Sequence, residues 1–151
     1  METIMNSIAS SQFNDRQILQ KDILFVDNDL ASYFLVMELL SEHGINVIHS
    51  RCGKHAISTF RETPSICVVL TELLLPNIDG FGVLKEIRRL NPYLPVVAQT
   101  ANVMNNMKHT CLEAGFDEFI EKPINIELFT KEITKYLKKS YFEDSVNEYS
   151  G

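Results

Sequence analysis

Five short apolar runs, each followed by a helical pattern, restrict the fold of this 151-residue chain more than any other feature. The runs are rich in β-branched and aromatic residues, as strands are, and lie at 23–26, 45–48, 66–70, 95–98 and 117–120. The helical patterns that alternate with them cover 30–43, 54–62, 80–90, 102–114 and 126–138. Gly44 and Gly115 stand where glycine commonly ends a helix. This alternation predicts a doubly wound α/β fold, with a parallel sheet buried by helices on both faces.

The chain has the usual length of one domain, and its composition is that of a globular protein. Hydrophobic residues make up 45% and charged residues 23% of the chain, so it can bury a core. The segment 1–20 is rich in Ser, Asn and Gln, and 140–151 is acidic and polar. We therefore expect a single domain over 21–139 between an N-terminal and a C-terminal tail.

The net charge of −6 argues against binding to nucleic acid or to an anionic membrane, since a phosphate surface requires clustered lysine and arginine. The basic run of Lys135, Lys138 and Lys139 is interpreted as complementing the negative C-terminal pole of the last predicted helix. We expect proteins or cations as partners.

Cysteine usage and the absence of targeting patterns predict a cytoplasmic protein. Cys52, Cys67 and Cys111 are odd in number and form no CxxC motif, which argues against a disulfide framework and a zinc site. Cys67 and Cys111 lie in apolar patterns, where free cysteine usually packs as a small hydrophobe. We find no secretion signal and no apolar run long enough to cross a membrane.

Polar residues end four of the five predicted strands. They are Asp27, Asn28 and Asp29 after the first, Thr71 and Glu72 after the third, Gln99 and Thr100 after the fourth, and Glu121, Lys122 and Pro123 after the fifth. Ligands of open parallel sheets bind beyond the carboxyl ends of the strands. Carboxylates suit Mg²⁺, and a hydroxyl and a lysine suit phosphoryl oxygens, so the pattern predicts a site for a divalent cation and a phosphoryl group. For Asp29, the alternative is a role as a helix N-cap.

Four separated motifs in this order, ILFVDND, TELLLPNIDG, VVAQTA and EKP, resemble the receiver domains of response regulators and hybrid histidine kinases. The resemblance covers about residues 22–139. It implies a flavodoxin-like (βα)5 fold with a five-stranded parallel sheet in the order 2-1-3-4-5. It also implies a non-enzymatic role in bacterial two-component phosphorelay signalling. The implied partners are proteins, namely a histidine kinase, a phosphotransfer protein or an output protein, and a homodimer remains an open alternative.

The resemblance also assigns roles to individual residues. It implies that Asp27, Asn28 and the main-chain carbonyl of Leu74 hold a metal ion together with the residue at position 72. The remaining residues implied to bind the phosphoryl group or to switch are Thr100 as the hydroxyl, Phe119 as the aromatic position, Lys122, and Pro123 after a cis bond.

The chain departs from the family at the reactive position. Counted back from Pro76, the position of the family's phosphoacceptor aspartate is occupied by Glu72. The position of one of the family's cation-binding acids is occupied by Asn28. The extra methylene displaces the carboxylate, and phosphoryl transfer is sensitive to such a displacement. Loss of one ligand charge predicts weak Mg²⁺ binding. Our hypothesis is an atypical, phosphorylation-independent or weakly phosphorylated interaction switch, in which Glu72 places a permanent charge near Lys122 and Thr100.

Two alternatives remain open at this point. Asp27, Asn28 and Asp29 formally match the D-x-D motif of haloacid dehalogenase-type phosphatases, in which Asp27 would be the nucleophile and Asp29 the acid. The chain lacks the hydroxyl or valine expected two residues later, where Ala31 stands. The other alternative is a docking or dimerisation scaffold whose pocket carries no signal.

Overall fold

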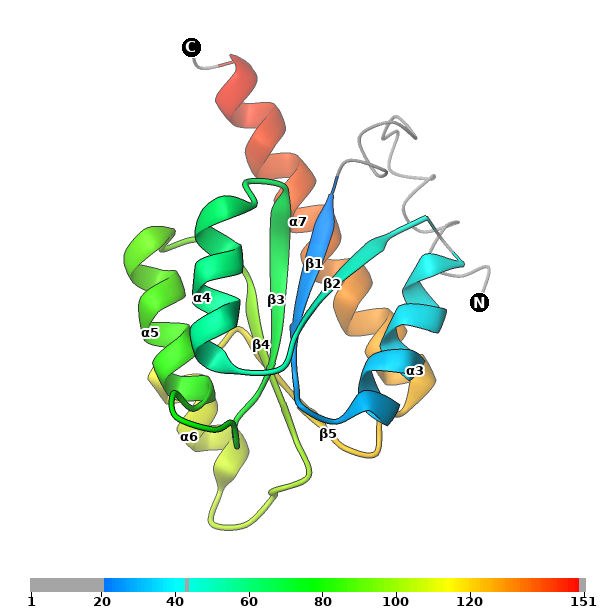
Figure 1. Cartoon of the computed structure of the whole chain (residues 1–151). Coiled ribbons are helices and arrows are strands. Elements are labelled where there is room, and N and C mark those ends of the chain that lie inside the picture. The colour runs from blue at the N-terminus through cyan, green and yellow to red at the C-terminus, as the bar shows by residue number, and fades with distance from the viewer. Residues whose placement is uncertain (1–20, 43, 150–151) are drawn as a thin grey trace.

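The computed structural model describes residues 21–42 and 44–149, with side chains up to residue 138. The predicted N-terminal tail, 1–20, lies outside the described residues. Strands and helices alternate along the described chain (Figure 1): β1 Asp22–Val26, α3 Leu30–Ser41, β2 Asn46–Ser50, α4 Gly53–Glu62, β3 Ile66–Glu72, α5 Gly80–Leu90, β4 Val96–Thr100, α6 Met107–Ala114, β5 Glu118–Glu121 and α7 Ile126–Tyr149. None of the described helices is long and apolar enough to cross a membrane.

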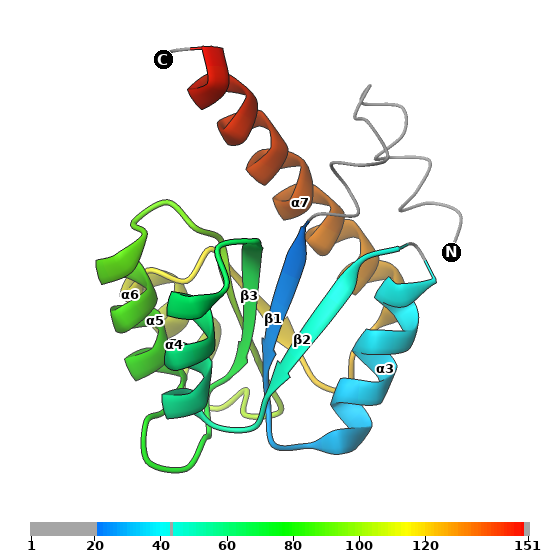
Figure 2. The ribbon, with the colours of Figure 1, turned by 45° about the horizontal axis from the view of Figure 1, so that its top comes forward.

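The strands form one parallel sheet in the order β2-β1-β3-β4-β5, which confirms the predicted topology. Helices α3 and α7 cover one face of this sheet, and α4, α5 and α6 cover the other (Figures 1 and 2). The central strand β3 is buried along its whole length. Because all strands run in the same direction, their carboxyl ends meet at one end of the molecule.

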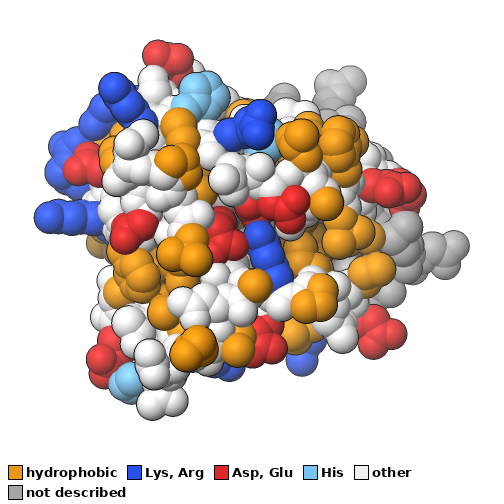
Figure 3. Space-filling model, turned by 60° about the horizontal axis from the view of Figure 1, so that its bottom comes forward, with side chains coloured by type: hydrophobic (Ala, Val, Ile, Leu, Met, Phe, Trp, Pro, Cys, Tyr) orange, Lys and Arg blue, Asp and Glu red, His pale blue; other side chains and the backbone are white. Residues whose placement is uncertain are grey.

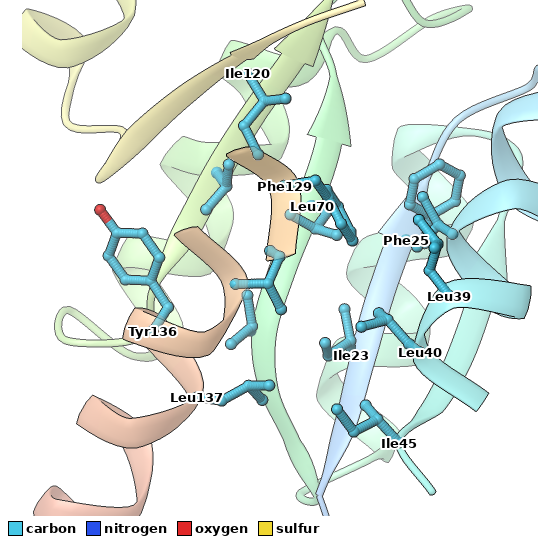
Figure 4. Packing of buried hydrophobic residues seen from close by; sticks show 14 of the residues in the cluster. Ile23, Phe25, Leu39, Leu40, Ile45, Leu70, Ile120, Phe129, Tyr136 and Leu137 are labelled. Carbon is cyan, nitrogen blue, oxygen red and sulfur yellow. The ribbon is translucent and has the colours of Figure 1, made fainter. Parts of the chain in front are cut away.

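Alternate residues of each strand feed two separate cores, one on each face of the sheet. In β1, Ile23 and Phe25 point toward the α3 and α7 side, whereas Leu24 and Val26 point toward the side of α4 to α6. Figure 4 shows the first core, in which Phe25, Leu39, Phe129 and other apolar side chains lie between the sheet and the two helices. Cys67 and Cys111 are buried in these cores, as expected for packing residues.

Helix α6 begins at Met107, five residues later than predicted. Asn105 and Asn106 adopt left-handed backbone conformations, with φ of 57° and 55°, which a right-handed helix excludes and which asparagine tolerates. The Asn102 side chain also accepts a hydrogen bond from the main-chain nitrogen of Met104, at 3.2 Å, and so stabilises the loop locally. Gly115 ends the helix with φ of 113°, as its position predicted.

Helix α7 continues to Tyr149, although the predicted helix ended at 138 and the residues from 140 onward were expected to form a tail. Lys135, Lys138 and Lys139 therefore lie in the middle of the helix, and its last turn contains no basic residue. The interpretation of these lysines as a complement to the C-terminal pole is wrong. The helix is longer because its sequence beyond 138 contains neither glycine nor proline before residue 150.

Gly80 allows the loop after β3 to fold back on the end of that strand. A Cβ at this position would lie 2.5 Å from the Glu72 carbonyl oxygen and 2.8 Å from the Leu73 Cα, both backbone atoms. The Gly80 main-chain nitrogen donates to the Leu73 carbonyl at 2.9 Å, so this close approach is also a hydrogen-bonded one. The absence of a side chain at Gly80 therefore allows the start of α5 to lie against the backbone at the end of β3.

We predict that Gly80→Ala lowers the free energy of unfolding by about 1–3 kcal/mol, because backbone atoms must move to accept the methyl group. Gly82→Ala is the matched control, since its Cβ would meet a side-chain atom, the Cγ2 methyl of Ile78 at 2.7 Å, and no backbone atom. Urea unfolding of both variants measures the difference. Equal stability of the two variants would contradict this account of the loop.

Candidate functional site

An ion-paired trio lies at the carboxyl end of the sheet, where Lys122 stands between Asp27 and Glu72. Its Nζ is 2.9 Å from the Glu72 Oε2 and also contacts the Asp27 Oδ2. The three residues come from the ends of β1, β3 and β5, so the parallel sheet brings them together from distant parts of the sequence. Figure 3 shows this end of the molecule, where acidic and basic side chains meet near the centre among scattered apolar ones.

The Glu72 carboxylate is bound through both of its oxygens. Its Oε1 accepts hydrogen bonds from the main-chain nitrogens of Leu73, at 2.9 Å, and Leu74, at 3.3 Å. Its Oε2 pairs with Lys122, and the residue is only 7% exposed. Charge-assisted hydrogen bonds of this kind hold a carboxylate firmly in one orientation.

Asp27 is almost completely buried and is held from three sides. Its Oδ1 accepts a hydrogen bond from the main-chain nitrogen of Asp29 at 2.9 Å, and its Oδ2 receives Lys122. The Gln99 Nε2 lies 3.5 Å from the same Oδ2, at the long end of hydrogen bonding. The Asp27 main-chain carbonyl accepts from the His49 Nε2 at 2.7 Å. A buried carboxylate requires such partners, because an unpaired charge is costly to bury.

The protonation of Lys122 is stabilised by its two partners. Burial acts to lower the pKa of this lysine, but the hydrogen bonds and negative charges of Asp27 and Glu72 outweigh it and raise the pKa above its ordinary value. Two carboxylates share one ammonium group, so the ionised trio carries one net negative charge.

Other predicted site residues lie nearby but are engaged elsewhere. The Thr100 hydroxyl is buried and accepts a hydrogen bond from the main-chain nitrogen of Asn102 at 3.1 Å. Asn28 is exposed. Leu74 contributes its main chain to the binding of Glu72, while its side chain is 70% exposed. Asp29 caps helix α3 by accepting from the Ala31 nitrogen at 3.1 Å and from the Ser32 hydroxyl, as the alternative for this residue stated.

Phe119 and Pro123 lie on either side of Lys122 in the sequence, and each has a defined environment. Phe119 is half-buried on β5 and lines an open pocket of about 420 Å³ between α6 and the start of α7. The other residues that line this pocket are Val103, Asn106, Met107, Lys108, Glu121 and Leu128. The bond between Lys122 and Pro123 is cis.

Two residues contact the site in ways that sequence reasoning did not anticipate. Gln99 was recognised as a strand-end residue but received no role, whereas in the structure it is fully buried against Asp27. His49 stacks on Tyr33, with ring centroids 4.1 Å apart, while its Nε2 bonds to the Asp27 main chain. One indication of this contact was present in the sequence: His49 lies near the end of β2, the strand that pairs with β1.

In the part of the chain that the structure describes, no group of three or more His, Cys, Asp and Glu side chains could hold a metal ion. The two buried carboxylates of the trio are the available acidic donors at the strand ends, and Lys122 already neutralises part of their charge. Mg²⁺ can bind through one or two carboxylates completed by water, so the two carboxylates are donors of the kind that this ion uses.

We predict that Lys122→Met lowers the free energy of unfolding by about 3 kcal/mol at neutral pH, because two buried carboxylates lose their shared cation. The folded-state pKa of Lys122 is raised, so its stabilising contribution is complete below the ordinary lysine pKa of about 10.4. The contribution is lost as the pH rises through the higher folded-state value. Urea unfolding of both proteins between neutral and strongly alkaline pH measures this difference.

The matched control adds Asp27→Asn and Glu72→Gln to Lys122→Met, which removes all three charges and should recover most of the lost stability. A difference between the parent and Lys122→Met that stays constant to high pH would show that the lysine acts only by packing.

Comparison with known proteins places these features in a family. The chain is 32% identical over 127 residues to a cyclic di-GMP phosphodiesterase from Thermotoga maritima, a match that covers 84% of the chain and 34% of that protein. It is 30% identical over 117 residues to the sensor histidine kinase RcsC of Escherichia coli K12, covering 78% of the chain and 12% of the kinase. The chain thus spans about a third or less of the length of these curated relatives.

Solved structures agree on the fold. A signal receiver domain from Vibrio parahaemolyticus superposes with a TM-score of 0.76 at 23% identity, covering 83% of this chain and 96% of that one. The family model described as the response regulator receiver domain matches residues 23–134, which include the trio, β1 from Ile23 onward and the other four strands. The chain therefore belongs to the response regulator receiver domain family and has the receiver fold of two-component phosphorelay systems.

Proposed function

We propose that this receiver domain acts as a protein-interaction switch that does not depend on phosphorylation. The observation that carries the proposal is the occupation of both Glu72 carboxylate oxygens. Oε1 is held by two main-chain N–H groups and Oε2 by Lys122. Glu72 thus supplies a permanent negative charge to Lys122 from the position of the phosphoacceptor.

The same contacts argue against phosphoryl transfer to Glu72. Transfer would form a bond between a carboxylate oxygen and phosphorus while the bond from phosphorus to the leaving group of the donor breaks. The hydrogen bonds to Oε1 from Leu73 and Leu74 and the ion pair of Oε2 with Lys122 draw electron density from both oxygens and so make each a weaker nucleophile. A displacement of about 1 Å in such a reaction can cost about 10²-fold in rate. The longer glutamate side chain and its fixed orientation therefore both lower the rate of phosphoryl transfer to Glu72.

Glu72 reproduces part of the phosphorylated state in this proposal. It contacts Lys122, whereas the Thr100 hydroxyl is bound to the main chain of its own loop through Asn102. A phosphoryl group carries about two charges and three acceptor oxygens, but a carboxylate has one charge and two oxygens. We therefore propose a permanent interaction with the lysine without full engagement of the hydroxyl.

Receiver domains typically bind Mg²⁺ at the phosphorylation site, and we propose that this one binds the ion weakly. Asp27, Glu72, the Asn28 side chain and the Leu74 carbonyl would hold the ion. Mg²⁺ would supply positive charge that neutralises phosphoryl oxygens. Asn28 offers a neutral amide where an acid would add charge, and Lys122 competes with the ion for both carboxylates.

Receiver domains interact with histidine kinases and phosphotransfer proteins, and we propose partners of these classes or an output protein for this chain. Receivers are generally non-enzymatic signalling domains, and we propose no catalytic activity and no nucleic-acid binding here. The phosphatase alternative gains no support, because Asp29, its required acid, is occupied as the N-cap of α3.

We predict that incubation with Mg²⁺ and acetyl phosphate leaves the parent protein unmodified in intact-mass spectrometry. Glu72→Asp shortens the side chain and should give a phosphorylated species, and adding Asn28→Asp should increase its yield and the affinity for Mg²⁺ and beryllofluoride. Asn28→Asp alone is the matched control, since it restores a metal ligand without an acceptor. A stable phosphate on Glu72 in the parent would overturn the proposal.

We predict that Glu72→Gln, which keeps the shape and removes the charge, shifts the NMR resonances of Thr100 and Phe119 as well as those of Lys122. A switch must transmit the change along β4 and β5 to the surface around Phe119. Glu86→Gln is the control, because it removes a carboxylate that pairs with Arg61 and Arg89 on the helical surface. Shifts confined to the immediate neighbours of residue 72 would favour the scaffold alternative.

A further inference from the structure

Four polar side chains form one row across the carboxyl end of the sheet, on the face that α3 and α7 cover. From one strand to the next, they are Asp27, Glu72, Gln99 and Lys122. The residues two positions before them all belong to the core on this face and are Phe25, Leu70, Val97 and Ile120 (Figure 4). Because side chains alternate between the two faces along a strand, the four polar residues are directed to the same side. The trio therefore has a fourth neighbour, which comes from β4.

Gln99 lies inside this row but makes only half of its possible contacts. It pairs in register with Glu72 on β3, and its Nε2 lies 3.5 Å from the Asp27 Oδ2. The side chain is fully buried, and its Oε1 has no hydrogen-bond partner among the described residues. Buried polar groups are paired with few exceptions, so an open acceptor beside three charged groups requires an explanation.

The Lys122 ammonium is a donor placed to use this acceptor. It carries three N–H groups, and its contacts with Asp27 and Glu72 leave one of them for a further acceptor. The ammonium and the Gln99 Nε2 contact the same oxygen, the Asp27 Oδ2. The main-chain nitrogen of Lys122 donates to the Thr100 carbonyl at 3.0 Å, which holds the base of the lysine beside the end of β4. A rotation within the flexible lysine side chain would therefore bring its ammonium to Gln99 without any change in the strands.

We propose that the Gln99 Oε1 is the acceptor to which Lys122 moves when Mg²⁺ occupies the carboxylates of Asp27 and Glu72. The inference rests on the Mg²⁺ binding proposed above. The ammonium and the ion compete for the same oxygens and repel each other, so the ammonium leaves them on metal binding. The Lys122 side chain is only 13% exposed, and a buried charge without a partner is costly. Gln99 thus keeps the displaced lysine hydrogen-bonded and lowers the cost of metal binding.

In this role Gln99 is a positioning residue, which acts through Lys122 and not on the ion itself. Its amide nitrogen faces Asp27, and the amide oxygen lies on the other side of the same carbon atom. That oxygen is therefore turned away from the carboxylate that would hold the ion. A dependence of the Gln99 effect on Lys122 distinguishes a positioning residue from a metal ligand.

Isothermal titration calorimetry of the full chain with Mg²⁺ tests the coupling between Gln99 and Lys122. Asn28→Asp serves as the common background, because the added carboxylate strengthens the metal site. In this background Gln99→Met, which removes the acceptor and preserves the length of the side chain, should weaken Mg²⁺ binding by about tenfold. With Lys122→Met also present no ammonium has to move, so Gln99→Met should then change the affinity by less than about twofold.

NMR of the lysine side chain provides a second measurement. The Lys122 ammonium signal should shift on saturation with Mg²⁺, and Gln99→Met should abolish the shifted signal, because an ammonium without an acceptor exchanges its protons with water. Thr134→Val is the matched control, since it removes a buried hydroxyl of α7 outside the row, and it should leave both measurements unchanged. Circular dichroism and urea unfolding check that each variant is folded. Gln99→Leu repeats the test with a second apolar side chain.

The possible outcomes separate this inference from the proposed function. Mg²⁺ binding that Gln99→Met leaves unchanged, or weakens equally with and without Lys122→Met, would overturn the role of Gln99 alone. A lack of Mg²⁺ binding in the Asn28→Asp background, both with and without Lys122→Met, would overturn this role together with the proposed metal site.

Discussion

The interaction on which this end of the molecule depends is the placement of one ammonium group between two buried carboxylates. Asp27 and Glu72 lie at the ends of neighbouring strands, and without a cation their charges would repel each other in a region that excludes water. Lys122 reaches them from β5, across the intervening strand β4. The trio therefore joins three separate segments of the sheet through charge, in addition to the hydrogen bonds between the strands.

The backbone around Glu72 holds the carboxylate of this residue in one orientation. Two main-chain N–H groups, from Leu73 and Leu74, point at one oxygen and leave the other for Lys122. Their direction depends on the tight loop that Gly80 permits. Glu72 thus lies beside a loop that approaches the end of its strand closely, and its carboxylate is bound through both oxygens.

Apolar periodicity predicted the five strands and the parallel sheet, because it is a local signal that agrees with the global fold. The order of the strands was implied by the resemblance of the four motifs to receiver domains. The sequence also predicted that Asp27, Glu72 and Lys122 come together, since parallel strands place their carboxyl ends at one edge. The late start of α6 was missed because Asn105 and Asn106 are compatible with either a helix or a left-handed turn, and tertiary structure decides between them. The end of α7 was misplaced because polarity beyond residue 138 suggested a tail, although the helix needs only the absence of a terminating residue. The position of Gln99 against Asp27 depends on side-chain direction at the sheet edge, and spacing alone does not determine it.

The Gln99 side chain is buried, and only one end of its amide group has a hydrogen-bond partner among the described residues. Its amide oxygen is buried and has no hydrogen-bond partner among the described residues, while its nitrogen makes one long contact with Asp27. A buried acceptor without a donor costs about 1–3 kcal/mol. An apolar residue of similar volume would not bury such an acceptor, but it would lose the contact of the Gln99 nitrogen with Asp27. Gln99 thus makes the carboxyl end of the buried strand β4 a polar part of the core, where hydrogen bonding and burial oppose each other.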